Sequence, residues 1–190
     1  ALPIFDYSVL QSGTWAKIRV PQSGFYQLTD ALIKKAGFSD PSKVKIYGYG
    51  GALQPEKLMA VYVIETDDLK ELPTCYAEGK RLFYGVGPVS WNESHQRVRN
   101  PYSTYGAYFL TENDQEATTL SWDAFVAKYY PREDDYCSLY ETDNYAWFQG
   151  GRNLYDSKVL SNGSANEYTV SSTGTSASGS VTVCVSAVAT

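Results

Sequence analysis

Three cysteines and one histidine are the side chains of this chain that could supply a nucleophile and its base. A cysteine–histidine dyad would require His95 to lie beside Cys75, Cys137 or Cys184. His95 stands in a polar stretch, and the carboxylates that precede Cys137 would raise its thiol pKa and oppose the thiolate. We therefore expect no catalytic dyad. We interpret the cysteines as buried free thiols, with one disulfide allowed but not implied.

Other motifs for catalysis or cofactor binding are weak. No Gly-x-Ser-x-Gly elbow occurs, and one histidine cannot supply the usual zinc ligand sets. The glycine-rich run at 48–51 follows a predicted strand but does not open a helix, so we expect a strand-ending turn and no phosphate loop. We predict no catalytic residue, no metal site and no cofactor, although a glycosidase-type pair of carboxylates stays open.

Carboxylates gather at three places where a calcium ion could be considered. Calcium prefers several oxygen ligands around one point, and none of the three runs has the spacing of an EF-hand loop. We interpret each run as a solvated acidic loop. The runs are Asp67, Asp68 and Glu71; Glu133, Asp134 and Asp135; and Glu141 and Asp143.

Aromatic side chains are the richest candidates for binding, since the chain has 17 Tyr, 4 Trp and 7 Phe. They cluster at 102–109, 122–130 and 145–148. Buried rings would form core, whereas exposed rings would offer a platform for a sugar or a protein partner, and both alternatives remain open. The interaction face that we predict consists of Trp91, Tyr102, Tyr105, Trp147 and Arg152.

Composition and charge limit the class of protein. The 190 residues are 43% hydrophobic, which allows a sizeable core, and the formal net charge is −5. An acidic chain has no electrostatic reason to bind nucleic acid and no polybasic membrane patch. No apolar run approaches the roughly 18 residues that a membrane helix needs. The Tyr, Ser, Thr and Gly usage favours a β-rich, exported protein.

The pattern along the chain predicts mostly strands with one clear helix. Thr29 can cap a helix over 30–36, and Gly37 can end it. The apolar residues at 122–130 do not decide between helix and strand. Alternating or apolar runs predict a hairpin of strands at 14–20 and 25–28, and further strands at 43–47, late in 57–65, at 81–84 and at 107–111.

A change of composition near residue 160 suggests a second domain. Ser, Gly, Thr, Asn and Ala dominate residues 161–180. Two strands are predicted at 167–170 and 181–189, around a loop rich in Ser, Gly and Thr. We expect an accessory domain over 1–160, with the truncated start of a second β domain over 161–190. The predicted fold class is α+β and mostly β: an antiparallel sheet domain followed by the start of a β-sandwich.

Several short stretches, in their shared order, resemble one known family. They are Ser12 to Val20 with Gly24 to Leu28, Lys45 to Gly51, Asp67 to Glu71, Leu82 to Pro88 with Trp91, Asn100 to Ser103, Tyr108 to Leu110, and Gly151-Arg152 before Leu154-Tyr155. This series is similar to the N-terminal region of Bacteroidetes C25 cysteine peptidases of the gingipain-like group, most of all to the region before the catalytic domain of type IX secretion sortases.

The resemblance implies a noncatalytic, prodomain-like accessory module. Its partners would be the downstream domains of the same polypeptide, against which it packs and which it positions. It also implies export, to the periplasm, the cell surface or the medium, with the cysteine peptidase domain elsewhere in the full protein. One departure from the family's pattern is that Gly151-Arg152 is followed by Asn153 and not directly by an acidic or aromatic pair. The alternative function is an adhesin module that binds a carbohydrate or a host protein, and a stand-alone carboxylate hydrolase is a further rival.

Overall fold

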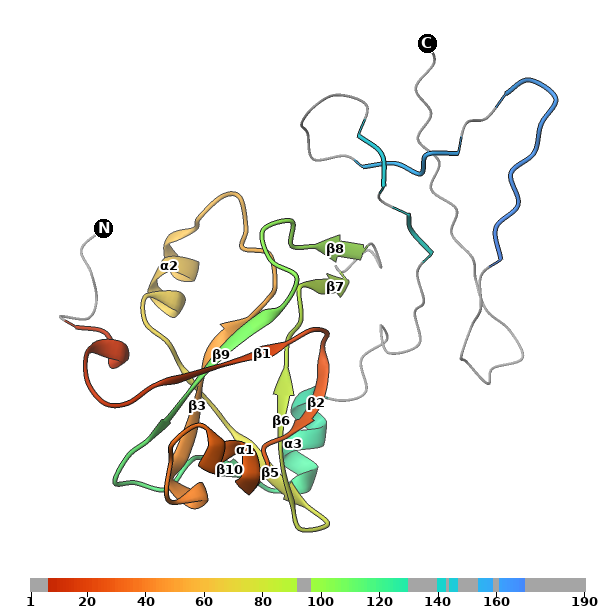
Figure 1. Cartoon of the computed structure of the whole chain (residues 1–190). Helices are drawn as coiled ribbons and strands as arrows, with labels where there is room; N and C mark the ends of the chain where they lie inside the picture. The colour runs from red at the N-terminus through yellow and green to blue at the C-terminus, as the bar shows by residue number, and fades with distance from the viewer. Residues whose placement is uncertain are drawn as a thin grey trace. The chain divides into compact units, whose positions relative to one another are not determined.

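The computed structural model describes residues 7–91, 97–129, 140–142, 144–146, 154–158 and 161–169. The chain divides into two compact units, residues 1–132 and residues 133–190 (Figure 1). The described part is α+β and mostly β, as the sequence predicts. All the helices and named strands of the described part fall in the first unit.

A first sheet of four strands has the order β1-β9-β3-β4, and each neighbouring pair is antiparallel. Its register pairs Ile18 with Tyr108 and Leu110 with Ile46, so that apolar side chains of successive strands share one face. The strands are β1 (Ala16–Val20), β9 (Gly106–Glu112), β3 (Val44–Gly50) and β4 (Glu71–Leu72).

A second sheet has the order β10-β5-β6-β2, and a two-stranded sheet joins β7 and β8. The predicted strands at 14–20 and 25–28 both form, but the predicted hairpin is wrong because β1 pairs with β9 and β2 pairs with β6. The strands are β10 (Thr119–Leu120), β5 (Thr74–Ala77), β6 (Lys80–Gly85), β2 (Gly24–Gln27), β7 (Val89–Trp91) and β8 (Arg97–Arg99).

The described residues contain three α-helices where the sequence predicts one clear helix. The predicted helix is α1 (Asp30–Lys35), whose first turn is capped by the Thr29 hydroxyl, which accepts from the Leu32 N–H. The ambiguous run at 122–130 is helical, as α3 (Trp122–Tyr129). The strand predicted late in 57–65 is wrong, because Ala60–Thr66 forms helix α2. Two short 3₁₀ turns, η1 (Val9–Gln11) and η2 (Pro41–Lys43), complete the helical elements.

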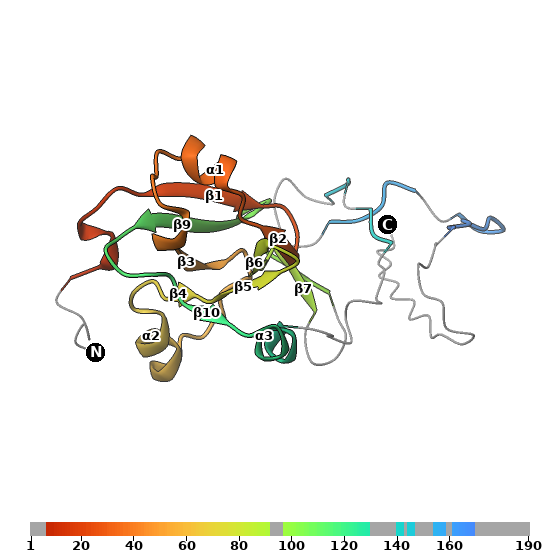
Figure 2. The ribbon, with the colours of Figure 1, turned by 90° about the horizontal axis from the view of Figure 1, so that it is seen from below.

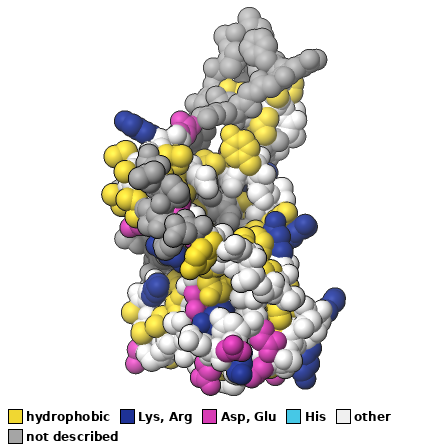
Figure 3. Space-filling view, turned by 90° about the vertical axis from the view of Figure 1, so that its left-hand side faces the viewer, with side chains coloured by type: hydrophobic (Ala, Val, Ile, Leu, Met, Phe, Trp, Pro, Cys, Tyr) yellow, Lys and Arg dark blue, Asp and Glu magenta, His cyan; other side chains and the backbone are white. Residues whose placement is uncertain are grey.

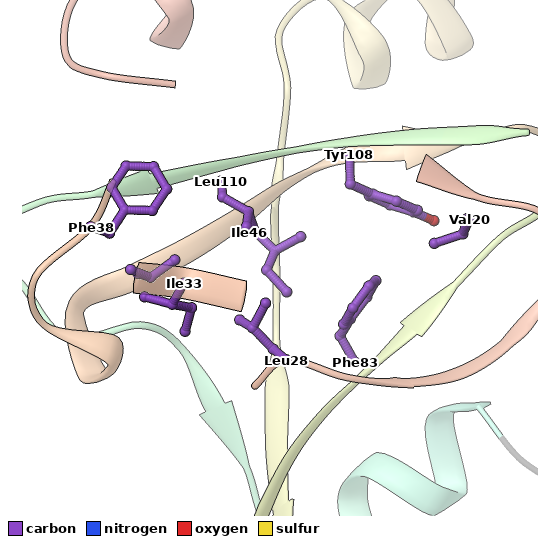
Figure 4. Close-up of a cluster of buried hydrophobic side chains, with 9 residues drawn as sticks. Val20, Leu28, Ile33, Phe38, Ile46, Phe83, Tyr108 and Leu110 are labelled. Carbon is purple, nitrogen blue, oxygen red and sulfur yellow. The ribbon is translucent and has the colours of Figure 1, made fainter. Parts of the chain in front are cut away.

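The larger hydrophobic core lies between the apolar face of the first sheet and strand β6, and α1 contributes Ile33 to it (Figure 4). Phe83 meets the edge of Tyr108 with ring centroids 5.8 Å apart. Ile33, Ile46 and Leu110 are fully buried. The members of this core are Val20, Leu28, Ile33, Phe38, Val44, Ile46, Phe83, Tyr108 and Leu110.

A smaller core lies between the second sheet and α3. It centres on Phe125, which is fully buried and packs with Cys75 and Tyr84. Tyr129, one turn later in α3, stacks on Tyr84 with ring centroids 5.1 Å apart. Leu82 and Tyr84 alternate with Phe83 along β6, so this strand supplies side chains to both cores. Strand β6 therefore lies between the first sheet and α3 (Figure 2).

Glycines allow the ends of several strands to approach one another closely. A Cβ at Gly106 would lie 2.1 Å from the Val86 carbonyl oxygen, and one at Gly87 would lie 2.5 Å from Cα of Gln22. The run at 48–51, predicted as a strand-ending turn, instead lies largely within β3, which reaches Gly50 through an irregular register after Tyr47. The prediction fails because a bulge, which glycine permits, lets the strand continue.

The second unit is described in short pieces. Tyr145 and Tyr155 form an isolated antiparallel bridge, with backbone N–H to O distances of 2.9 and 2.8 Å. Tyr140 and Tyr168 make an edge contact, and the Lys158 ammonium lies 4.3 Å from the Tyr168 ring centroid. Residues 167–169 form no strand, while residue 170 and residues 181–189 lie outside the described part. The domain boundary near residue 160 stays a prediction.

Candidate interaction face

The face of the first sheet that points away from the core carries aromatic and basic side chains. Alternation along β1 places Lys17 and Arg19 on this side, opposite Ile18 and Val20, which pack inward. Lys17 stands in register with Phe109 on β9, and Phe109 stands in register with Tyr47 on β3. We call this surface the cationic face and define it by Trp15, Lys17, Arg19, Tyr47, Tyr105 and Phe109.

Cation–π contacts organise one end of the cationic face. The Arg19 guanidinium lies 4.4 Å from the Tyr105 ring centroid. The Lys17 ammonium lies 5.9 Å from the centroids of both Tyr105 and Phe109. Lys17 and Arg19 are exposed, while the two rings are half-buried. The cations are thus held over the sheet by the negative faces of aromatic rings and remain open to solvent.

The other end of the cationic face is more firmly packed. Trp15 meets Tyr47 edge to face at 5.4 Å, and the Trp15 indole N–H donates to the Ser12 carbonyl at 2.7 Å. Burial, followed by the charges of Glu71 and Asp68, raises the pKa of Tyr47. Beside it, Lys45 forms a largely buried ion pair with Glu71 at 3.4 Å.

Three residues of the predicted interaction face, Trp91, Tyr102 and Tyr105, lie in the described part of the first unit. Tyr105 belongs to the cationic face, beneath Arg19. Tyr102 is 82% exposed in the turn before β9, and its N–H donates to the Asn100 side chain. Trp91 is half-buried in β7, opposite Arg97. Neither Trp91 nor Tyr102 makes a ring contact with another described residue, and Trp147 and Arg152 lie outside the described residues.

Sequence reasoning missed Lys17 and Arg19 as candidate site residues. The signal was present in the alternation of the stretch at 14–20, which places Trp15, Lys17 and Arg19 on one side of a strand. Their partners on β9 could not be found this way, because the strand that pairs with β1 is separated from it by most of the first unit.

The candidate catalytic residues are described only in part. Cys75 is a free, fully buried thiol whose pKa is raised by burial, and this confirms its predicted structural role. His95, Cys137 and Cys184 lie outside the described residues. A raised pKa keeps the Cys75 thiol protonated near neutral pH, which is the wrong state for a nucleophile.

Two carboxylates of the run predicted as a solvated acidic loop serve internal contacts instead. Asp68 accepts from the Ser8 hydroxyl at 2.9 Å, from the Val9 N–H at 2.7 Å and from the Leu69 N–H at 2.8 Å. Glu71 pairs with Lys45 and accepts from the Thr118 N–H at 2.7 Å. Both carboxylates thus bind residues that are distant in the sequence, and the spacing of the acidic run does not predict these contacts. Within the described residues, no group of three or more His, Cys, Asp or Glu could hold a metal ion.

Of the other two acidic runs, the structure describes only Glu141. The remaining members, Glu133, Asp134, Asp135 and Asp143, lie outside the described residues. Their interpretation as solvated loops stays a prediction. Among the described residues there is also no helix long and apolar enough to cross a membrane.

A second surface of the first unit is apolar and centres on α2 and the segment before it. We call it the α2 patch and define it by Leu58, Met59, Val61 and Ile64, whose exposed fractions are 60%, 61%, 65% and 53%. Hydrophobic side chains gather on this side of the molecule in Figure 3. No residue of α2 is buried.

Beside the α2 patch, an open groove of about 530 Å³ separates α2 from the N-terminal segment. Val9 and Ile64 contribute apolar lining, and Asp68, which also lines the groove, accepts hydrogen bonds from Ser8 and Val9. Tyr49 connects α2 to the first sheet, because its hydroxyl donates to the carbonyl oxygens of Glu65 and Asp68. The full lining is Tyr7, Val9, Ile64, Glu65, Asp68, Leu69 and Lys70.

Comparison with known proteins finds a similarity among the solved structures. No protein-family model and no curated protein matches the chain. The crystal structure of dimeric latent PorU from Porphyromonas gingivalis is similar, with 45% sequence identity over 55% of this chain and a TM-score of 0.48. The match spans 10% of the PorU chain.

Proposed function

We propose that this chain is a noncatalytic, prodomain-like accessory module of a secreted or surface C25-type cysteine peptidase associated with type IX secretion. It packs against downstream domains of the same polypeptide and positions them. The ordered series of stretches that resembles this family supports the proposal, as does the 45% identity to part of latent PorU.

The α2 patch is the observation that carries the proposed packing role. A short helix is marginal in water and is normally stabilised by burying an apolar face. Helix α2 has seven residues, and none of them is buried within the first unit. Leu58, Met59 and Val61 expose more than half of their surface, and apolar patches of this kind mark surfaces that a partner covers. A downstream domain of the same polypeptide is the occupant that the family resemblance implies.

The proposal also includes export, a second β domain and the predicted interaction residues. Export to the periplasm, the cell surface or the medium follows from the family resemblance. Residues 161–190 would belong to a second β domain. The predicted interaction residues Trp91, Tyr102, Tyr105, Trp147 and Arg152 would contact neighbouring domains, and Tyr102 suits this role because its ring is largely exposed.

The proposal is tested by removing apolar surface from α2 in two contexts. We would make a double variant that carries both Leu58→Ser and Val61→Ser. Its stability would be measured once in the 190-residue chain and once in the full-length gene product, each against the unmodified protein. Serine and valine have similar helix propensities, so the substitutions act mainly on apolar burial. In the short chain we expect an unchanged melting temperature, because both side chains are exposed. In the full-length protein we expect a loss of about 2 kcal/mol or more in unfolding free energy.

A matched control replaces Leu32 and Tyr76 by serine, because these side chains are 37% and 54% exposed on other elements. The control should change the unfolding free energy by the same amount in the 190-residue chain and in the full-length protein. If the α2 variant also has the same stability in both contexts, no downstream domain covers α2, and the packing role is wrong.

A further inference from the structure

Two cations on the cationic face have no ion-pair partner among the described residues. The ammonium of Lys17 and the guanidinium of Arg19 are exposed, and neither has an ion-pair partner within the described part of the chain. Lys45, on the same sheet, differs because Glu71 neutralises it at 3.4 Å. The exposed part of this face therefore carries a local positive charge, although residues 1–132 hold 14 basic and 14 acidic residues and are neutral as a whole.

The positions of these cations are set before any ligand arrives. Arg19 lies 4.4 Å from the Tyr105 centroid, which holds a flexible side chain against a half-buried ring. Lys17 lies between Tyr105 and Phe109. Because both cations belong to one strand at alternate positions, they face the same side and are spaced as the alternate side chains of an extended peptide are. A guanidinium held in this way loses less entropy when it binds a carboxylate.

We infer that the cationic face binds an extended acidic peptide segment, with carboxylates on Lys17 and Arg19 and apolar side chains against Phe109 and Tyr47. Charge complementarity requires an anion, and carboxylate matches the planar donors of Arg19. This inference goes beyond the proposed packing role, because it concerns a different surface from the α2 patch and does not depend on it.

Sugars and nucleic acids fit this face less well than an acidic peptide does. A sugar ring needs an open aromatic face, but Arg19 covers Tyr105, and Trp15 and Tyr47 contact each other edge to face. A nucleic acid needs many phosphate contacts and a strongly basic surface. This face offers two cations that lack an ion-pair partner among the described residues, on a unit with no formal net charge. A peptide can place a few carboxylates and a few apolar groups at strand spacing, which is what the face provides.

The inference is tested with a short fluorescein-labelled peptide of alternating glutamate and valine, titrated with the 190-residue chain and followed by fluorescence polarisation. We expect binding that weakens as salt is added and that is absent for the matched glutamine–valine peptide. The combined substitution Lys17→Gln and Arg19→Gln should weaken binding about tenfold or more. Arg19→Lys keeps the charge but loses the planar donors, so it should weaken binding about threefold.

The matched control is Lys34→Gln with Lys35→Gln, which makes the same change in net charge on exposed residues of α1. It should leave peptide affinity within about twofold of the unmodified chain. The inference is wrong if this control and the Lys17/Arg19 variant lose affinity equally, or if the glutamine–valine peptide binds as well. It is also wrong if a heparin fragment or single-stranded DNA binds to these residues more tightly than the acidic peptide. Since α2 is unchanged in these variants, the outcome is separate from the test of the packing role.

Discussion

At the scale of single residues, buried polar groups in the first unit are satisfied by partners distant in sequence. Arg81 in β6 is the clearest case, because its side chain is almost fully buried and donates to one hydroxyl and two backbone carbonyls, without a carboxylate partner among the described residues. Its Nε donates to the Thr74 hydroxyl at 3.1 Å, and its two terminal nitrogens donate to the carbonyls of Pro41 at 2.7 Å and Val44 at 2.8 Å. Arg81 therefore ties β6 to the start of β3, and burial lowers its pKa.

The substitution Arg81→Met should destabilise the first unit strongly. It removes three hydrogen bonds and leaves two backbone carbonyls without their donors, which we expect to cost about 3 kcal/mol of unfolding free energy. Urea unfolding followed by circular dichroism measures this loss. Lys80→Met, on the exposed neighbouring residue, is the control and should change stability by less than about 0.5 kcal/mol. Equal effects of the two substitutions would show that the Arg81 bonds do not stabilise the fold.

At the scale of elements, several segments depend on contacts rather than on their own propensity. The N-terminal turn η1 has no buried residue, and Asp68 holds it by accepting from Ser8 and Val9. Helix α2 likewise forms in a run whose apolar residues suggested a strand. Short apolar runs do not distinguish helix from strand, so the outcome depends on the chain's connections, here the return from β3 to β4.

Attachment of η1 should depend on pH through Asp68. Burial favours the neutral acid, but hydrogen bonds from Val9, Leu69 and Ser8 outweigh it and hold the pKa of Asp68 below its ordinary value of 3.8. A group with a lowered folded pKa contributes stability above its unfolded pKa. That contribution is lost as the pH falls below about 4 and through the folded pKa.

Nuclear magnetic resonance of the Val9 amide proton measures this attachment. We expect its shift to change between pH 5 and pH 2 with a midpoint below the ordinary carboxyl pKa. Asp68→Ala should give the detached shift at every pH, whereas Asp114→Ala, at an exposed acid, should leave the titration unchanged. A midpoint above the ordinary value, or a detached shift in the unmodified chain at pH 5, would contradict the role of Asp68.

At the scale of the whole molecule, apolar packing and net charge are distributed unequally along the chain. Both hydrophobic cores are built from residues before 130. Residues 133–190 carry 2 basic and 7 acidic residues, so the formal charge of −5 falls in the second unit. The first unit thus contains the elements that a self-supporting domain needs.

A fragment of residues 1–132 should fold without the second unit. We expect a single cooperative thermal transition and native near-ultraviolet circular dichroism, because Phe125 and the whole of α3 remain in the fragment. Ending the chain at residue 118 is the matched comparison. It removes β10 and α3, and with them Phe125 and Leu120, and should abolish cooperative unfolding. A fragment of residues 1–132 that unfolds without cooperativity would show that the first unit needs residues beyond it.

The sequence by itself determined the local features of this protein. Alternation at 14–20 and 43–47, and apolar or aromatic runs at 81–84 and 107–111, correctly predicted strands. The Thr29 cap with Gly37 correctly predicted α1. The same local patterns supported the α+β class and the resemblance to C25 peptidase N-terminal regions. These features follow from side-chain periodicity and backbone preference, which act over a few neighbouring residues.

Only the tertiary structure decided which strands pair and what each surface presents. β1 pairs with β9, not with β2, because its apolar side chains pack with those of β9 in one core, and no property of residues 14–28 alone specifies that partner. The same pairing sets Lys17 and Arg19 over Tyr105 and Phe109. The cationic face is therefore a product of long-range register, and a sequence pattern could locate only its β1 residues.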